Sequence, residues 1–487
     1  MSLAGGGAGC VLPDYIEADG ECQQGTPWTR QIGGGLADIA LAAAPDPCGG
    51  VTIGGGIQST VAFSSEISLV ADNKDLDGFV ARFDAVGNTL WAASIGSSGQ
   101  QIVSHVGTDI VGDTVAAGSF VGTLSPGGGE SFKGEGDPSA PVPSSPTGGN
   151  KDGREYSGFI TKLDLFGAHA WTRVFLGPTD MTSTTPCGVA VDREGNVTVA
   201  GNFTGSVTIE GSTLTGQGES SIFMAHFDAA GGLLWKKAFA TEKGTECNAL
   251  AADKDGNILM TGMHRSAIDF GIGPLAGPTI EGGQKYFVLK MDPAGNLAWS
   301  AGSATGDGHG GTAIASDAEG NVFVGGSFLG MINLGAGDFS SKAVDLFVQK
   351  RNSAGEPQWG RVFSPAMTGL VVALVTAIQT DASGDVLLGG SIFGDLVLDQ
   401  HLVAQMEDIP SNDAYIARLR GSNGEPVASR LLNGPGDLAI TGLAVDAEGL
   451  PIVVSAFTKS IDLGPGAGLL EADDVGLGTM FVSKLKL

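Results

Sequence analysis

The segment GFVARFDAVGNTLW, residues 78–91, carries the pattern that decides the fold of this chain. An alternating apolar run leads into an Asp-x-x-Gly turn, and a second alternating run ends at tryptophan. This pattern predicts a β-hairpin, because the aspartate caps its own backbone and the glycine adopts the positive φ of the turn. Further copies of the pattern occupy residues 158–171, 222–235, 286–299, 346–359 and 414–427.

A second hairpin pattern, GVAVDREGNVTVAGNF in residues 188–203, lies between successive copies of the first. Its other copies occupy residues 249–264, 313–328, 377–392 and 442–457. Two hairpins per repeat predict four antiparallel strands, here called A to D, and a four-stranded sheet repeated around an axis is the blade of a β-propeller. Because one hairpin cannot bury its own faces, we expect the blades to stack, with the strand D tryptophan between neighbours.

The number of blades follows from the strand pairs A and B, which begin seven times along the chain. The last repeat ends after strand C at residues 481–487, and residues 26–33 resemble a strand D that precedes the first strand A. We therefore predict an all-β fold, a seven-bladed β-propeller with four antiparallel strands per blade, in which the N-terminal strand completes blade 7. An open solenoid is the alternative, but it needs capping units at its ends.

The chain is expected to divide into an N-terminal leader or linker, residues 1–24, and a single propeller, residues 25–487. In a propeller the A–B and C–D turns lie on one face, here called the short-turn face, and the B–C and D–A connections lie on the other, here called the loop-rich face. The composition of residues 122–157, rich in proline, glycine and serine, predicts a flexible insertion on the loop-rich face. We expect a ligand on this face, because binding residues usually lie on loops held by a rigid scaffold.

Charge and hydropathy exclude several classes of partner. The chain has 26 basic and 53 acidic residues, a formal net charge of −27. Nucleic acids and anionic membrane surfaces are not expected to bind, because the field of the protein would repel them. No apolar stretch reaches the roughly 18 residues of a transmembrane helix. We expect a monomer without a transmembrane segment.

The repeats resemble those of the bacterial SBBP-type β-propeller family. The match is carried by Phe79, Asp84, Gly87, Asn88 and Trp91 and by their counterparts in later repeats, and it covers about residues 26–487. The resemblance implies a secreted or surface-attached bacterial protein, frequently without a defined activity.

Two blades depart from this repeat pattern. Blade 1 lacks the usual Asp-Gly-Asn turn between strands A and B, and Val427 stands in blade 6 where other blades have tryptophan. Quinoprotein dehydrogenase propellers also have a turn followed by Leu-Trp. The sequence lacks the adjacent cysteine pair and the clustered calcium ligands of those enzymes, so no cofactor is expected.

The five cysteines fit an oxidising compartment. Cys187 and Cys247 begin strand A in adjacent blades, at what we interpret as the same repeat position, so a disulfide between them is expected. A second disulfide is expected between Cys22 and Cys48. Cys10 follows small residues, as at the end of a bacterial lipoprotein signal, and is the candidate for lipidation. The alternative is five free thiols. We expect a secreted or bacterial cell-surface protein, with an outer-membrane lipoprotein as one form.

Two sets of side chains are candidates for binding. The first closes strand B in each blade, and it either packs between blades or forms a stacking platform for a sugar. Its members are Ile57, Phe120, Phe203, His264, Phe328, Ile392 and Phe457, with His264 the departure from the apolar pattern. The second set lies in the D–A connections and either binds a polar ligand or is solvated surface charge. Its members are Asp180, Glu242, Glu246, Asp307, His309 and Asp437.

No catalytic residue and no metal site is predicted. The turn aspartates lack the alternating carboxylates of a calcium loop, so we interpret them as turn caps. The leading hypothesis is a non-enzymatic secreted or surface-attached propeller that binds a protein or glycan through its loop-rich face. Alternatives are a carboxylate-based hydrolase or lyase at the channel mouth and a purely structural envelope module. Two carboxylates about 5 to 9 Å apart in a shared pocket would favour hydrolysis.

Overall fold

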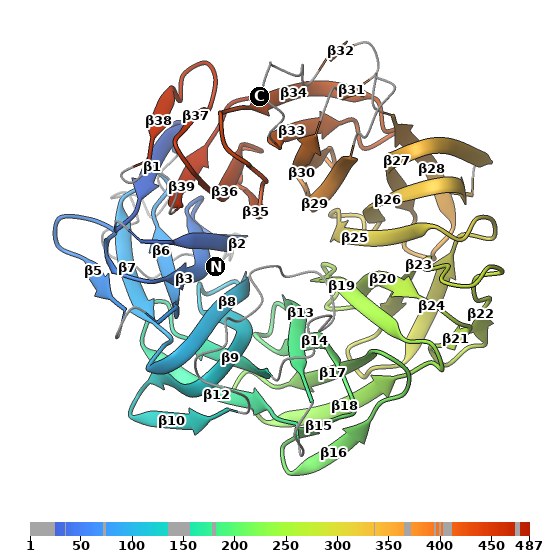
Figure 1. Cartoon of the computed structure of the whole chain (residues 1–487), viewed down its shortest axis with the longest axis horizontal. Coiled ribbons are helices and arrows are strands. Elements are labelled where there is room, and N and C mark those ends of the chain that lie inside the picture. The colour runs from blue at the N-terminus through green and yellow to red at the C-terminus, as the bar shows by residue number, and fades with distance from the viewer. Residues whose placement is uncertain are drawn as a thin grey trace, which may run out of the picture.

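The computed structural model describes residues 25–34, 36–71, 75–134, 156–177, 182–335, 337–364, 372–393, 396–398, 401–402, 412–472 and 478–487. Every regular element in these ranges is a β-strand. Seven small antiparallel sheets surround a central axis, as Figure 1 shows, and the predicted seven-bladed β-propeller is confirmed.

The first four blades follow each other along the chain, each from its inner to its outer strand. Blade 1 contains β2 (Ile39–Pro45), β3 (Val51–Ile57), β6 (Asp77–Phe83) and β7 (Thr89–Ser94). Blade 2 contains β8 (Ser98–Thr108), β9 (Thr114–Gly127), β11 (Ser157–Leu163) and β12 (His169–Phe175). Blade 3 contains β13 (Thr184–Val191), β14 (Val197–Phe203), β17 (Ser221–Phe227) and β18 (Leu233–Phe239). Blade 4 contains β19 (Thr245–Ala252), β20 (Ile258–His264), β23 (Lys285–Met291) and β24 (Leu297–Gly302).

The last three blades complete the ring. Blade 5 contains β25 (His309–Ser316), β26 (Val322–Asn333), β27 (Asp338–Arg351) and β28 (Pro357–Phe363). Blade 6 contains β29 (Val372–Thr380), β30 (Val386–Phe393), β33 (Asp413–Leu419) and β34 (Pro426–Leu432). Blade 7 contains β35 (Gly442–Val445), β36 (Pro451–Phe457), β39 (Thr479–Lys484) and β1 (Trp28–Ile32).

The ring closes as predicted, because β1 from the N-terminal side is the outer strand of blade 7. It pairs antiparallel with β39, from Trp28 opposite Lys484 to Ile32 opposite Met480. In Figure 1 the blue β1 accordingly lies beside the red β39. Opposite ends of the chain therefore share one sheet.

The B–C connections carry further strands that the sequence analysis did not predict. Five are separate hairpins or short pairs: β4 (Thr60–Ala62) with β5 (Ser68–Val70), β15 (Ser206–Ile209) with β16 (Ser212–Thr215), β21 (Ile268–Asp269) with β22 (Pro274–Leu275), β31 (Val397–Leu398) with β32 (His401–Leu402), and β37 (Ser460–Asp462) with β38 (Leu469–Glu471). In blade 2, β10 (Glu130–Lys133) pairs with the extended β9, so the beginning of the expected insertion is strand. The rest of that insertion, residues 135–155, lies outside the described residues.

The aspartates of the A–B turns cap the turns, as predicted, and they also bind a cation. The Asp253 carboxylate accepts hydrogen bonds from the backbone N–H groups of Asp255 and Asn257 and binds Lys290 Nζ at 2.7 Å. Burial alone would raise the pKa of Asp253, but the hydrogen bonds from Lys290 and Asn257 lower it. The same pairing of a turn aspartate with a strand C cation occurs in six blades: Asp46–Arg82, Asp109–Lys162, Asp253–Lys290, Asp317–Lys350, Asp381–Arg418 and Asp446–Lys484.

Blade 1 is regular at this turn despite its unusual sequence. The backbone N–H of Gly49 donates to Asp46 O at 3.0 Å, and the N–H of Cys48 donates to the Asp46 carboxylate at 2.7 Å. Asp46-Pro-Cys-Gly49 therefore forms the same Asp-x-x-Gly turn as the other blades, and the departure noted in the sequence does not alter the fold.

The tryptophans on strand D join each blade to the next. Each indole N–H donates to a backbone carbonyl in the C–D turn of the following blade, at 2.9 to 3.1 Å. The six pairs are Trp28–Ala85, Trp91–Leu165, Trp171–Ala229, Trp235–Pro293, Trp299–Ser353 and Trp359–Gly421. These contacts confirm that the tryptophans lie between neighbouring blades.

Our alignment of Val427 with the tryptophans is wrong, because the C–D turn of blade 6 is one residue longer than that of blade 5 and Ala428, opposite Arg418, occupies the tryptophan position. Blade closure explains why blade 6 has no tryptophan there. Strands C and D of blade 7 come from opposite ends of the chain, so they are not joined by a C–D turn that could offer a carbonyl. Ala428 instead has a small, partly exposed side chain. Arg430 on the same strand donates to the backbone oxygen of Lys486 at 2.9 Å and so connects blades 6 and 7.

Candidate functional site

The inner strands build a narrow channel along the axis. In six of the described inner strands a β-bulge leaves one residue unpaired, so consecutive side chains on these strands face the channel. The cavity measures about 160 Å³. The bulge residues, with their blade 7 counterpart, form one layer of its wall: Leu41, Ser104, Cys187, Asn248, Thr312, Thr376 and Thr441.

Several of these bulge residues connect neighbouring blades around the channel. The hydroxyl of Thr312 donates to Val375 O at 2.6 Å, the hydroxyl of Thr441 donates to Ala40 O at 2.7 Å, and the amide of Asn248 donates to Gly311 O at 2.8 Å. Each acceptor lies one residue before the bulge of the next blade. Each of these hydrogen bonds therefore joins the inner strands of two neighbouring blades.

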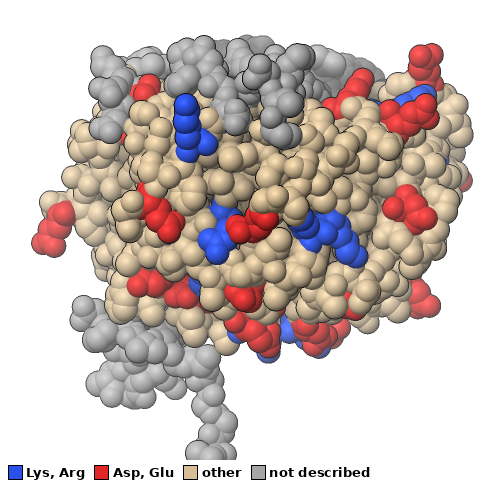
Figure 2. Space-filling view, turned by 90° about the horizontal axis from the view of Figure 1, so that it is seen from below, with Lys and Arg blue, Asp and Glu red and all other residues tan. Residues whose placement is uncertain are grey.

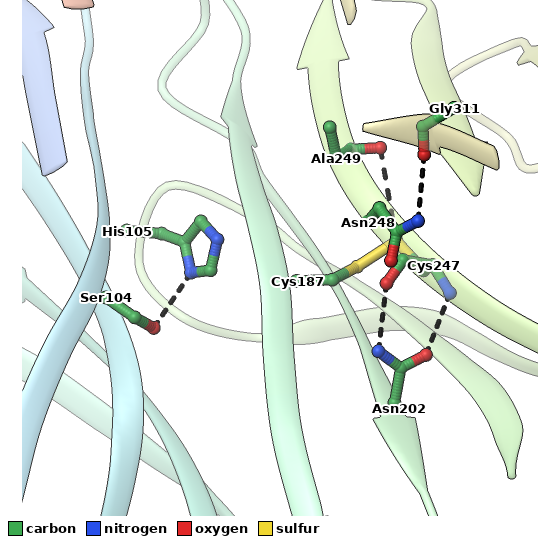
Figure 3. Close-up of a disulfide and its surroundings, with 8 residues drawn as sticks. All are labelled: Ser104, His105, Cys187, Asn202, Cys247, Asn248, Ala249 and Gly311. Carbon is green, nitrogen blue, oxygen red and sulfur yellow. Dashed lines mark hydrogen bonds between the residues drawn. A yellow bond between two sulfur atoms is a disulfide. The ribbon is translucent and has the colours of Figure 1, made fainter. Parts of the chain in front are cut away.

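The expected disulfide between Cys187 and Cys247 is present between blades 3 and 4, with a Cα–Cα distance of 5.9 Å (Figure 3). Our interpretation that the two cysteines occupy the same repeat position is wrong. Cys187 is the bulge residue of blade 3, whereas Cys247 precedes the bulge residue Asn248 of blade 4. The disulfide therefore replaces a hydrogen bond of the kind made by Thr312.

The other cysteines can be followed only in part. Cys48 takes part in a disulfide. Cys22, the partner that the sequence analysis expects for it, lies outside the described residues, as does Cys10 with its expected lipidation.

His105 faces the channel and was missed by the sequence analysis. The equivalent residues of the other blades are alanine or glycine: Ala42, Gly188, Ala249, Ala313, Ala377 and Gly442. Its Nδ1 lies 2.9 Å from Ser104 Oγ (Figure 3), and burial lowers the pKa of His105 to about 4. Aligning the inner strands by their bulges would have revealed it as the one large residue of this layer.

A pocket of about 340 Å³ opens between blades 4 and 5 on the loop-rich face. Asn248 and Thr312 line both this pocket and the channel, so the pocket lies at the channel mouth. Its other lining residues are Glu246, Met263 and Gln284 of blade 4 and Gly308, His309, Gly310, Ser327, Phe328, Leu329 and Val344 of blade 5 and the connections that lead into it.

Glu246 is the charged residue of the pocket wall. It is only 3% exposed, and Arg265 Nη1 binds its Oε1 at 2.8 Å. Its Oε2 is buried and has no hydrogen-bond partner among the described residues. The corresponding strand positions elsewhere in the ring are occupied by Ile39, Ile102, Thr185, Gly310 and Leu374. Glu246 is therefore a carboxylate at a position where the repeat uses uncharged residues.

His309 lies at the pocket but has no free nitrogen. Its Nδ1 accepts a hydrogen bond from the backbone N–H of Tyr286 at 2.9 Å, and its Nε2 donates to Thr305 O at 3.2 Å. Burial lowers the pKa of His309 to about 4, so the imidazole is neutral at pH 7. These contacts indicate that His309 positions the loop that precedes β25.

His264 is also buried, at the end of β20. Its Nδ1 lies 2.8 Å from Ser266 O and its ring lies beside Phe287. Burial, followed by the nearby charge of Lys285, lowers the pKa of His264. His264 is not among the residues that line the pocket.

The residues that close strand B do not form a stacking platform. All seven are buried, and the rings of Phe120 and Phe203 pack against Phe159 and Phe223 of their own blades. The B–C connections pass over them, so that Gly134 and Gly216 approach these rings closely. The burial of all seven side chains supports the packing interpretation for this set and leaves none of their rings exposed for stacking on a sugar.

The remaining carboxylates of the D–A connections do not join Glu246 in the pocket. Asp307 accepts a hydrogen bond from the backbone N–H of Thr279 at 3.0 Å and lies 3.8 Å from Lys285 Nζ. Asp437 is exposed and accepts hydrogen bonds from Asn412. Glu242 is exposed as well, and Asp180 lies outside the described residues. Within the described lining of this pocket, Glu246 is the sole carboxylate.

Comparisons with known proteins add no family. No protein-family model and no curated protein sequence matches the chain. The structure is similar to that of Sqt1 from Chaetomium thermophilum, with 12% identity, a TM-score of 0.42, and coverage of 95% of this chain and 100% of that chain. A protein of unknown function from Dyadobacter fermentans has 11% identity and a TM-score of 0.39, with coverage of 78% and 94%.

A gluconolactonase from Xanthomonas campestris, XC5397, has 16% identity and a TM-score of 0.30, with coverage of 67% of this chain and 82% of that chain. These scores are low, so the architecture rests on the strand pairing described above. In the described part of the chain no helix is long and apolar enough to cross a membrane.

Proposed function

We propose that this protein is a binding propeller that holds a protein or glycan ligand on its loop-rich face, anchored in the pocket between blades 4 and 5. The observation that carries the proposal is Glu246, which lines this pocket and whose buried Oε2 has no partner among the described residues. An unpaired buried carboxylate oxygen costs about 1 to 3 kcal/mol, more than most single contacts contribute.

The fold does not need a carboxylate at this position. Ile39, Ile102 and Leu374 occupy it in blades 1, 2 and 6, and those blades close equally well. Proteins keep such locally unfavourable residues mainly where function requires them. A ligand that donates a hydrogen bond to Oε2 would remove the cost, so the residue is better explained by binding than by folding.

The setting of the protein is part of the proposal. The disulfide between Cys187 and Cys247 supports an oxidising compartment, and with it a secreted or cell-surface location. The propeller repeat supports the resemblance to SBBP-type bacterial proteins, and lipidation of Cys10 belongs to the same proposal. A hydrolase using paired carboxylates is the weaker candidate, because the pocket contains one carboxylate among its described residues.

The proposal can be tested by filling the pocket. A Cβ atom on Gly310 would lie 3.8 Å from Gln284 Nε2 and 3.9 Å from Met263 Sδ, which is ordinary contact, so Gly310→Leu fits the backbone and occupies the cavity. Wild-type protein and the variant are applied to a glycan array and to an array of peptides. We expect the ligands of the wild-type protein to lose at least tenfold in affinity for Gly310→Leu.

The matched control is Thr185→Leu, at the equivalent strand position of blade 3. It adds the same side chain to another part of the channel mouth and should leave binding unchanged. Equal binding by the wild-type protein and Gly310→Leu would contradict the proposed site.

A further inference from the structure

We propose that the pocket between blades 4 and 5 receives a lysine or arginine side chain of a protein partner, an inference that rests on the proposed binding function. Glu246 and its neighbours determine the class of ligand by the hydrogen-bonding groups that they leave free.

Glu246 supplies the charged acceptor of the pocket. Its Oε2 has no partner among the described residues, whereas Oε1 binds Arg265. Asn248 donates to Gly311 O and keeps its carbonyl oxygen as an acceptor, the hydroxyl of Thr312 donates to Val375 O, and both nitrogens of His309 are occupied. Gln284 and Ser327 also line the pocket and can donate as well as accept. A cationic head group with several donors matches the charged acceptor, and lysine and arginine have such head groups.

The rest of the pocket wall fits the aliphatic part of such a side chain. Met263, Leu329 and Val344 line the cavity beside the polar atoms, and Leu329 is 51% exposed although it is a large apolar residue. Lysine and arginine bury their methylene groups on apolar surface while the charged group reaches a polar partner. The pocket therefore offers both surfaces that these side chains require.

A sugar fits the pocket less well. Carbohydrate rings pack on exposed aromatic faces, but the one aromatic ring of the lining, Phe328, is 1% exposed. The net charge of −27 adds a long-range attraction for basic partners. In the side view of Figure 2, acidic side chains are more frequent than basic ones over the visible surface.

The test uses three small probes and the intact protein. The probes are N-acetyl-lysine methylamide, N-acetyl-arginine methylamide and N-acetyl-norleucine methylamide, which has the lysine stem without the charge. Binding is followed by ligand-observed NMR titration. We expect the cationic probes to bind at least tenfold more tightly than the norleucine probe, because only they can donate charged hydrogen bonds to Glu246.

Two variants locate the effect. Glu246→Gln should weaken the cationic probes about tenfold and leave the norleucine probe unchanged. Asp437→Asn removes an exposed carboxylate from the same face and should change neither. The inference is overturned if the norleucine probe binds as tightly as the cationic probes, if Glu246→Gln binds like wild type, or if neither cationic probe binds at millimolar concentration.

These outcomes are distinct from those of the pocket-filling test. Loss of array ligands by Gly310→Leu, together with no response of the cationic probes to Glu246→Gln, would keep the proposed function and remove the cationic side chain as the ligand. Unchanged array binding by Gly310→Leu would contradict the proposed function itself.

Discussion

The short-turn face and the blade 4–5 pocket differ in how closely their residues follow the repeat pattern. On the short-turn face an aspartate–cation pair recurs in six blades, and six tryptophans donate to the next blade. In the pocket, Glu246 and Met263 stand at positions that other blades fill with uncharged or small residues. In a repeat protein, residues that recur from blade to blade indicate what the fold requires. Residues that differ from the repeat pattern in one blade indicate a function of that blade.

The largest expected effect comes from breaking the recurring framework at a tryptophan. Trp359→Ala should lower the free energy of unfolding by about 3 to 5 kcal/mol, because it removes a buried ring and its hydrogen bond to Gly421. Urea denaturation followed by circular dichroism would measure the change.

The control is the blade that lacks this contact. Ala428→Ser in blade 6 should cost less than about 1 kcal/mol, because the side chain is small and partly exposed. Ala428→Trp should bring no gain, because no C–D turn of blade 7 offers an acceptor. A stabilising Ala428→Trp would contradict our explanation of this departure.

The next effect concerns the buried ion pairs. Lys290→Met should destabilise the protein by about 3 kcal/mol, because Asp253 would be left buried without its cation. Urea denaturation would again give the value. The double variant Lys290→Met with Asp253→Asn should recover part of the loss. A single variant as stable as wild type would show that the recurring pair is not required for the fold.

A smaller effect on stability is expected from Asp38, which directly precedes the inner strand of blade 1. The pH dependence of stability that it causes can be compared with that caused by the turn aspartates of the short-turn face. Burial raises the pKa of Asp38 to about 6, although the backbone N–H groups of Gln58 and Gly34 bind it. The folded state therefore favours the protonated form. This contribution to stability is complete below about pH 4, is lost as the pH rises through 6, and is absent at pH 7.

Asp38→Asn makes the expectation measurable. Relative to wild type, the variant should gain stability as the pH is raised from 4 to 7, as determined from urea midpoints at each pH. A difference between the two proteins that stays constant over this range would contradict a raised pKa. Turn aspartates such as Asp253, whose pKa is lowered, should show the opposite slope.

The blade count, the closure and one disulfide could be predicted from the sequence, because hairpin turns recur with their aspartate and glycine. The pocket could not, because its residues become comparable only when the bulge at Asn248 and Thr312 sets the register. The same bulge explains the error in the cysteine positions. Cys187 and Cys247 were assigned to one repeat position, but Cys247 stands one position before the one that Cys187 occupies in its blade.

Other errors have a similar cause. The aromatic residues that end strand B were candidates for sugar stacking because the short strands of the B–C connections, which cover Phe120 and Phe203, have no strong sequence pattern. The missing tryptophan of blade 6 was assigned to Val427 because the extra residue of its C–D turn has no clear sequence pattern, and the pairing of Arg418 with Ala428 corrects the register.

The most direct test measures binding and stability on the same two variants. For Glu246→Gln, the account predicts a loss of about tenfold in affinity for N-acetyl-lysine methylamide and a smaller loss of stability than Lys290→Met causes, because the substituted amide oxygen can still accept a hydrogen bond from the partly exposed Arg265. For Lys290→Met, it predicts unchanged affinity and a loss of about 3 kcal/mol in stability. If Glu246→Gln loses as much stability as Lys290→Met and keeps its affinity, the pocket carboxylate belongs to the framework and the central claim is wrong.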